Sequence, residues 1–379
     1  MIKFGDPNVG EEELHLIRKI FDSKVFVHGE FTAEFERKFG AQFGYGHSIS
    51  VANCTAGLHL AHYSLTKGLD KQSSRKFEVI CPAMTHVATA HAIELSGLKP
   101  IFVDCNSVDA NINVDLIESL ITEKTVGIAA MHFNGVPCDI RKIMDIASKY
   151  GLYVVEDCAI ALGAKVGGRP VGTFGNAGAF SFHPVKQITT GEGGMVCVND
   201  SSFGAELRLE RAFGVDRNFK ERSRDGVYDV PLLGFNYRMA EIPAAMGVAQ
   251  LDKFQALEIA RQRNFRHLKQ GIDGISGLEV VGGEDTSGRS YYCLIARVNC
   301  SSSDRDWLAK ELKNREIQTS VYYPHPVPRL NFYARKYELD MEYFKNAITI
   351  ADQTIAFSIG AHLNIDDMDR VLLNLKELI

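Results

Sequence analysis

The feature that most constrains this chain is a segment in which two short apolar runs each lead into a polar residue. The first run, Leu152–Val155, is followed by Asp157, and the second run, 177–182, is followed by Lys186. Short apolar runs bounded by turn residues are typical of buried strands in an α/β sheet. Ligands of such sheets bind at the carboxyl ends of the strands. We therefore expect a carboxylate and an amine at one edge of a buried sheet.

The pattern of strands and helices along the chain predicts an α/β fold with two domains. Strands are expected at 49–52, 79–81, 101–103 and 126–131, and helices at 11–22, 30–43, 85–96 and 138–150. Alternation of this kind favours a mostly parallel sheet covered by helices on both faces. At 379 residues the chain exceeds the size at which a single core stops growing.

The C-terminal third predicts a smaller α+β domain. A long helix, 239–261, is expected to lead out of a large domain, 1–250, into a small domain, 251–379. Strands are expected there at 290–298 and 318–324, and helices at 304–314 and 367–378.

Composition excludes several classes of function. The net charge of −5 supplies no basic stripe for nucleic acid. No apolar run approaches the ~20 residues that cross a bilayer, and the N-terminus lacks signal-peptide architecture. We therefore expect a cytoplasmic protein without a membrane anchor. The eight cysteines form no Cys-x-x-Cys pair, and His59 and His62 have no third partner at zinc spacing, so reduced thiols and no metal site are predicted.

Three residues of the central segment suit one cofactor. A buried Lys186 would have a lowered pKa, so that its neutral amine can form a Schiff base with an aldehyde. Asp157 can pair with a pyridinium nitrogen and keep the ring cationic. The hydroxyl of Ser181, five residues before the lysine, can hold a phosphate. Pyridoxal phosphate (PLP) needs all three contacts.

The strings EDCA, GTFGNAGAFSFHPVK and TTGEGG resemble the core signature of the DegT-type (DegT/DnrJ/StrS) sugar aminotransferases. These are fold-type I PLP enzymes, and most act on nucleotide-linked keto-sugars. The resemblance implies a mostly parallel seven-stranded sheet flanked by helices. It also implies that Lys186 carries the cofactor, that Asp157 meets the ring nitrogen and that Ser181 binds the phosphate.

Two further turns complete the cofactor site by the same resemblance. Thr55 and Ala56 begin a helix, and its free N–H groups suit a phosphate; a simple N-cap would require the same geometry. Cys54 stands where the family usually has glycine. His86 occupies the position of an aromatic residue that stacks on the PLP ring, and an imidazole can also stack.

A second signature, LLGFNYRMAEIPAAMGVAQL, implies a homodimer with shared active sites. In the family its asparagine, here Asn236, reaches the phosphate bound by the partner subunit. Arg238 is expected to be structural or to contact the carboxylate of a glutamate donor. The basic segment 203–229 is expected to be a solvated helix and loop, or a contact for the nucleotide diphosphate.

Sugar contacts are weaker expectations. The connector containing His28 and Gly29 lies near the sugar in the family, although it could simply pack on the sheet. Tyr323 and His325 resemble the family's Tyr-Pro loop. Ile160 replaces the usual Gln or His that reaches the cofactor's phenolic oxygen or the substrate. Either another residue supplies that hydrogen bond, or the bond between Lys186 and the cofactor is tuned differently.

The implied reaction is a ping-pong transamination. Lys186 would release PLP to L-glutamate and move the proton, and the resulting pyridoxamine phosphate would aminate the keto carbon of a nucleotide-linked deoxysugar for surface polysaccharide or O-antigen synthesis. Three alternatives stay open: a cyclitol or other carbocyclic ketone as acceptor, a PLP-family sugar dehydratase, and a catalytically idle regulator or scaffold. The dehydratases carry His where this chain has Lys186, which argues against them.

Overall fold

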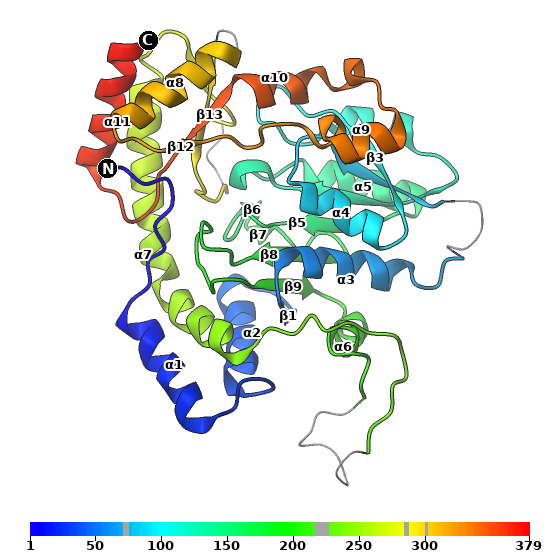
Figure 1. Ribbon diagram of the computed structural model, residues 1–379. Coiled ribbons are helices and arrows are strands. Elements are labelled where there is room, and N and C mark those ends of the chain that lie inside the picture. Colours follow the sequence, from blue (N-terminus) through cyan, green and yellow to red (C-terminus); the bar gives the residue numbers. More distant parts are fainter. Residues whose placement is uncertain (71–75, 217–226, 284–287, 300–301) are drawn as a thin grey trace.

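The structure is a computed structural model that describes residues 1–379 except 71–75, 217–226, 284–287 and 300–301. Its central feature is a seven-stranded sheet in the order β1-β9-β8-β5-β4-β2-β3 (Figure 1). The strands are β1 His47–Val51, β2 Glu78–Pro82, β3 Lys99–Val103, β4 Thr125–Met131, β5 Tyr153–Asp157, β8 Ala177–Ser181 and β9 Gly194–Val198. β9 runs in the direction opposite to the other six strands of this sheet. The mostly parallel seven-stranded sheet is confirmed.

Helices cover both faces of this sheet. They are α1 Glu11–Ser23, α2 Glu30–Phe43, α3 Cys54–Thr66, α4 Val87–Leu95, α5 Ile140–Tyr150, α6 Ser201–Glu210 and α7 Glu241–Ile272. Side chains of β8 alternate between the two faces: Ala177 and Ala179 pack with α3, whereas Phe180 packs with α2 and α7. Because the strand is buried on both sides, it reads as a continuous apolar run.

The C-terminal part forms a second, antiparallel sheet in the order β10-β11-β13-β12. Its strands are β10 Leu278–Val280, β11 Leu294–Val298, β12 Thr319–Ser320 and β13 Thr354–Phe357, and its helices are α8 Ser302–Asn314, α9 Asn331–Tyr337, α10 Lys345–Gln353 and α11 Ile365–Leu378. A short hairpin, β6 Lys165–Val166 and β7 Arg169–Pro170, lies between β5 and β8 in the chain. Ile2 at the N-terminus pairs with Ile317 and belongs to the core of this second sheet.

Helix α7 links the two parts, and its length differs from the expectation. It continues to Ile272 instead of ending at Arg261. Its first half packs Leu251 and Phe254 into the core beneath the large sheet, and its second half packs Phe265 and Leu268 into the core of the small sheet. A helix with apolar residues for two cores has no sequence signal at the point where one core ends. The division of the chain at residue 250 stays a prediction.

One expected strand is mostly absent. The run 318–324 forms β12 over Thr319–Ser320 only, and the following tyrosines, Tyr322 and Tyr323, leave the sheet. Their rings pack on each other with centroids 5.5 Å apart. The high strand propensity of tyrosine is therefore overridden by packing between the two parts of the chain.

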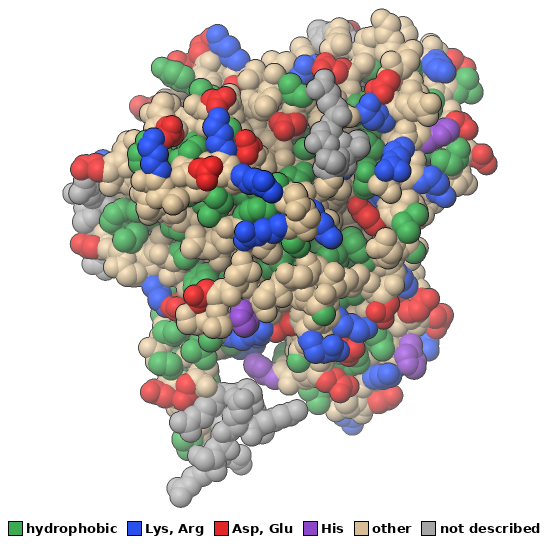
Figure 2. All heavy atoms as spheres, turned by 180° about the vertical axis from the view of Figure 1, so that it is seen from behind, with side chains coloured by type: hydrophobic (Ala, Val, Ile, Leu, Met, Phe, Trp, Pro, Cys, Tyr) green, Lys and Arg blue, Asp and Glu red, His purple; other side chains and the backbone are tan. Residues whose placement is uncertain are grey.

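The surface is mixed in character. Figure 2 shows acidic and basic side chains interspersed over the rear face, with hydrophobic side chains exposed between them. In the described part of the chain, no helix has both the length and the apolar character to span a membrane. Seven cysteines are buried with free thiols, and Cys300 lies outside the described residues.

Candidate active site

A cavity of about 610 Å³ lies where the carboxyl ends of the parallel strands meet. It is lined by six of the predicted site residues: Thr55, His86, Asp157, Ser181, Lys186 and Tyr323. β5 ends at Asp157 and its parallel neighbour β8 ends at Ser181, which brings these two side chains to one edge. The topology therefore brings together residues that are far apart in the sequence.

Asp157 is a buried carboxylate that is held by neutral donors. Thr89 on α4 donates its hydroxyl proton to Oδ2 at 2.7 Å, and the backbone N–H of Ala159 donates to Oδ1 at 3.0 Å. Only 2% of the residue is exposed. An ionised carboxylate in such a place is best compensated by a cation. A protonated ring nitrogen entering the cavity would supply one.

Lys186 reaches the same cavity from the loop after β8. Burial lowers the pKa of its amine, although the nearby charge of Asp157 opposes this effect. Its Nζ lies 5.0 Å from the centroid of the Tyr292 ring. A lowered pKa increases the fraction of neutral amine at physiological pH, and the neutral form is the nucleophile.

The N-terminus of α3 faces the cavity beside Ser181. Thr55 lies in the first turn of this helix, where free N–H groups and the helix dipole favour an anion. The N–H of Ala56, however, donates to the side chain of Asn53 at 2.8 Å. A phosphate bound through Ala56 would have to replace or share that contact. The cofactor role of Ala56 thus stays a prediction.

A glycine turn lets β9 approach the start of α3. A Cβ atom on Gly194 would lie 2.7 Å from the backbone of both Asn53 and Cys54. Only glycine avoids this clash, which accounts for the glycines that follow Lys186 in the sequence.

His86 and Tyr323 form one wall of the cavity. Their ring centroids lie 5.6 Å apart with an interplanar angle of 62°. His86 is also the N-cap of α4 and accepts the N–H of Ala88 at 3.2 Å through Nδ1. This bond fixes the imidazole at the cavity edge, where it could stack on a planar ligand.

Besides Ala56, five predicted residues do not line this cavity: His28, Gly29, Asn236, Arg238 and His325. Gly29 donates its N–H to Glu241 at 2.9 Å, and Arg238 packs over the ring of Phe213 at 4.8 Å. Asn236 is exposed on an extended segment whose flanking rings, Phe235 and Tyr237, pack on α3. Its side chain is therefore free to face another subunit. The roles of these five residues stay predictions.

Ile160 is buried in the core, and 1% of it is exposed. It contributes no polar group to the cavity.

Three residues that the sequence did not predict lie close to the predicted ones: Thr89, Tyr292 and Tyr322. Tyr292 and Tyr322 line the cavity and join their hydroxyl groups at 2.8 Å. The position of Thr89 could have been predicted from the sequence. It lies four residues after Thr85 in the expected helix 85–96, and residues four apart lie on the same face of a helix.

One cluster among the described residues has the composition of a metal site: His132, Glu156 and Cys158. The oxygens of Glu156 already accept the N–H groups of Gly172 at 2.7 Å, of Phe174 at 2.8 Å and of Gly175 at 2.7 Å. His132 Nε2 lies 3.0 Å from the same carboxylate. The Glu156 carboxylate is therefore already used to hold the turn before β8. We assign this cluster a structural role.

The residues of the cavity fit PLP. The cavity is lined by a buried carboxylate, by an amine with a lowered pKa, and by a helix N-terminus beside a serine. These groups would suit the ring nitrogen, the aldehyde and the phosphate of PLP. The fold and this site together define a PLP-dependent transaminase of fold-type I.

The chain belongs to the DegT/DnrJ/EryC1/StrS aminotransferase family, whose sequence model matches residues 7–376. It is 34% identical over 335 residues to the GDP-perosamine synthase of Escherichia coli O157:H7, covering 88% of this chain and 87% of that protein. It is 29% identical over 387 residues to UDP-4-amino-4-deoxy-L-arabinose–oxoglutarate aminotransferase of Shewanella sediminis, covering 98% and 97%. Spr1654 of Streptococcus pneumoniae, solved in its PMP form, superimposes with a TM-score of 0.92 at 25% identity, covering 100% and 98%. The protein is thus a sugar aminotransferase with PLP as its cofactor.

Proposed function

We propose that this enzyme transfers an amino group from L-glutamate to the keto carbon of a nucleotide-linked deoxysugar. The observation that carries the proposal is that the Lys186 amine and the buried Asp157 carboxylate line one cavity. The names of its relatives support the acceptor, since they include a GDP-linked and a UDP-linked amino sugar. One of those names also contains oxoglutarate, the keto acid that glutamate becomes when it gives up its amino group. Products of this kind would serve surface polysaccharide or O-antigen synthesis.

PLP when bound would supply an electron sink. In our proposal, Lys186 would hold the cofactor through its amine and would be the general acid–base that moves the proton. Asp157 would pair with the ring nitrogen, and Thr89 fixes the orientation of that carboxylate. Ser181 and the first turn of α3 hold the phosphate. His86 and Tyr323 exclude water from the face of the ring.

We further propose that the active enzyme is a homodimer in which Asn236 completes the partner's phosphate site. Exposed apolar side chains near Asn236 in the sequence support an interface there. They are Phe213, Tyr228, Val230 and Leu233, and Leu233 is 70% exposed. Large exposed apolar residues in such a group are typical of protein interfaces. His28 and Gly29 would then approach the sugar of the partner's site.

A substrate panel tests the proposal. The enzyme is incubated with L-glutamate and GDP-, UDP- and dTDP-linked keto-sugars, and with carbocyclic ketones, and amino products are identified by mass spectrometry. We expect amination of at least one nucleotide-linked keto-sugar, and none with Lys186→Ala. Amination of the carbocyclic ketones alone would contradict the proposed acceptor. Loss of a hydroxyl group without amination would contradict the proposed reaction.

A further inference from the structure

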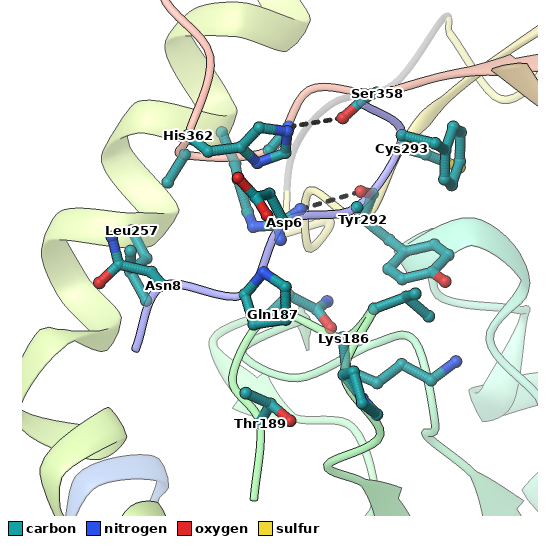
Figure 3. Close-up of a pocket in the computed structure, with 18 of the residues that line it drawn as sticks. Asp6, Asn8, Lys186, Gln187, Thr189, Leu257, Tyr292, Cys293, Ser358 and His362 are labelled. Carbon is teal, nitrogen blue, oxygen red and sulfur yellow. Dashed lines mark hydrogen bonds between the residues drawn. The ribbon is translucent and has the colours of Figure 1, made fainter. Parts of the chain in front are cut away.

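Two charged side chains on one face of α7 hold the backbone of the segment that carries Tyr292. Glu258 accepts the N–H of Tyr291 at 3.1 Å through Oε1, and Arg261 donates from Nη1 to the carbonyl oxygen of Tyr292 at 3.0 Å (dashed line in Figure 3). Residues three apart on a helix point in the same direction. Glu258 and Arg261 therefore bind the backbone of two successive residues in one segment.

Tyr292 in turn contacts Lys186. Figure 3 shows the ring of Tyr292 and the side chain of Lys186 lying one above the other and pointing to the same side. The Nζ atom lies 5.0 Å from the ring centroid, and the tyrosine hydroxyl bonds to that of Tyr322. The ring is thus fixed at its backbone by α7 and at its tip by a second tyrosine.

The burial of Glu258 and Arg261 would be unfavourable if these side chains served only to pack α7 against its neighbours. Glu258 Oε2 and Arg261 Nε are buried without a hydrogen-bond partner in the part of the chain that the structure describes. Burial raises the pKa of Glu258 to about 7. Buried ionisable side chains with unsatisfied atoms are often less favourable than apolar residues of similar volume. Their retention at this point suggests a task other than joining α7 to its neighbours.

We propose that Glu258 and Arg261 are positioning residues that hold the Tyr292 ring against the Lys186 amine and so shield that amine from water. Neither residue lines the cavity, so neither is a catalytic residue. The inference depends on Lys186 being the reactive amine, as proposed above.

The Tyr292 ring has two opposed effects on Lys186. Its face attracts the ammonium form, which raises the amine pKa, and its bulk excludes water, which lowers it. The pKa of Lys186 is lowered, with burial as the largest cause, and we take the Tyr292 ring to act mainly through this burial. Loosening the ring should therefore raise the pKa of Lys186.

The test measures the pKa of individual lysines in the full-length protein freed of cofactor. Acetic anhydride reacts only with neutral amines, so the pH midpoint of labelling, read for each lysine by peptide mass spectrometry, reports its pKa. In Arg261→Met we expect the Lys186 midpoint to rise by about half a unit to one unit. The midpoint of the exposed Lys149 should stay where it is.

Three further variants separate positioning from general damage. Arg261→Lys keeps the charge but loses the planar fork, so we expect a smaller rise; it replaces Arg261→Met if that variant does not fold. Arg263→Met alters the same helix, where Arg263 donates to the carbonyl of Leu363 at 3.2 Å, and should leave Lys186 unchanged. In a Tyr292→Ala background, Arg261→Met should add no further shift.

The outcomes are distinct. An unchanged Lys186 midpoint in the folded Arg261 variants, an equal rise in Arg263→Met, or a full additional rise in the Tyr292→Ala background would overturn the inference. Labelling requires no turnover, so this result is independent of whether the substrate panel supports the proposed reaction.

Discussion

At the scale of single residues, the hydrogen bond between Thr89 and Asp157 links α4 to the end of β5. The Thr89 hydroxyl donates to one carboxylate oxygen and the Ala159 N–H donates to the other. Asp157 also lines the cavity. The carboxylate is therefore oriented before any ligand arrives.

This orientation leads to a prediction for two variants. Asp157→Asn should lower kcat/KM by about 10²–10³-fold, because a neutral amide cannot keep a ring nitrogen protonated. Thr89→Val should lower it by about tenfold, since one hydrogen bond to a charged group is lost while the charge remains. Steady-state kinetics on folded variants, checked by circular dichroism, measure both effects. Equal losses in the two variants would show that the orientation of Asp157, and not its charge, matters.

The sequence predicted that Asp157, Ser181 and Lys186 lie at one edge of the sheet, because they lie at or just after the ends of apolar runs and the ends of parallel strands meet. Tyr292 could not be found in this way. It reaches Lys186 from a segment more than a hundred residues later, through packing between the two parts of the chain. No local pattern encodes such a contact.

At the scale of elements, Glu36 on α2 joins three segments around the seven-stranded sheet. It accepts the backbone N–H of Ser50 on β1 at 2.9 Å and pairs with Arg211 at 2.6 Å and with Arg208 on α6. Burial opposes ionisation, but the two arginines outweigh it, so the pKa of Glu36 is lowered. The carboxylate is therefore a stabilising contact at neutral pH.

We expect Glu36→Gln to lower the free energy of unfolding by about 2 kcal/mol at pH 7, at the low end for a buried pair because Arg208 is partly exposed. A lowered pKa gives stability that is complete above the ordinary pKa of ~4.3 and is lost as the pH falls through the folded value. The difference between wild type and variant should therefore shrink below about pH 4.

Urea denaturation at pH 7 and at acidic pH measures this difference. Glu34→Gln is the control, since Glu34 lies on the same helix and pairs loosely with Lys38 at 3.8 Å. It should change stability by less than about 0.5 kcal/mol. A Glu36→Gln penalty that stays constant down to acid pH would contradict the role of the charge.

Elements with a single apolar face were predictable, and elements shared between two cores were not. Helix α2 has the predicted bounds, because its phenylalanines recur at helical spacing and glycines flank both ends. Helix α7 was predicted too short, and the strand at 318–324 was predicted too long. Both errors fall where the small sheet packs against the large domain.

At the scale of the whole molecule, the cavity contains no contribution from Asn236, although the family signature assigns that residue a role at the phosphate. A shared site in a homodimer would reconcile the two observations. Lys186→Ala and Asn236→Ala should then each be inactive in their own dimers, because every site lacks one group.

Mixing these two variants tests the shared site. A hybrid dimer has one site with both lesions and one intact site, so an equal mixture that exchanges subunits should regain about a quarter of wild-type activity. Light scattering confirms the dimers, and an Asn236→Ala mixture with itself is the control. No recovery after proven subunit exchange, or an active monomer, would refute the shared site.

The central claim is that one amine, that of Lys186, binds the cofactor. The most direct measurement reduces the PLP-loaded enzyme with sodium borohydride and locates the modified residue by peptide mass spectrometry. We predict a pyridoxyl group on Lys186, and none on the Lys186→Ala protein. A pyridoxyl group on another lysine, or no stable modification of a PLP-saturated enzyme, would contradict it.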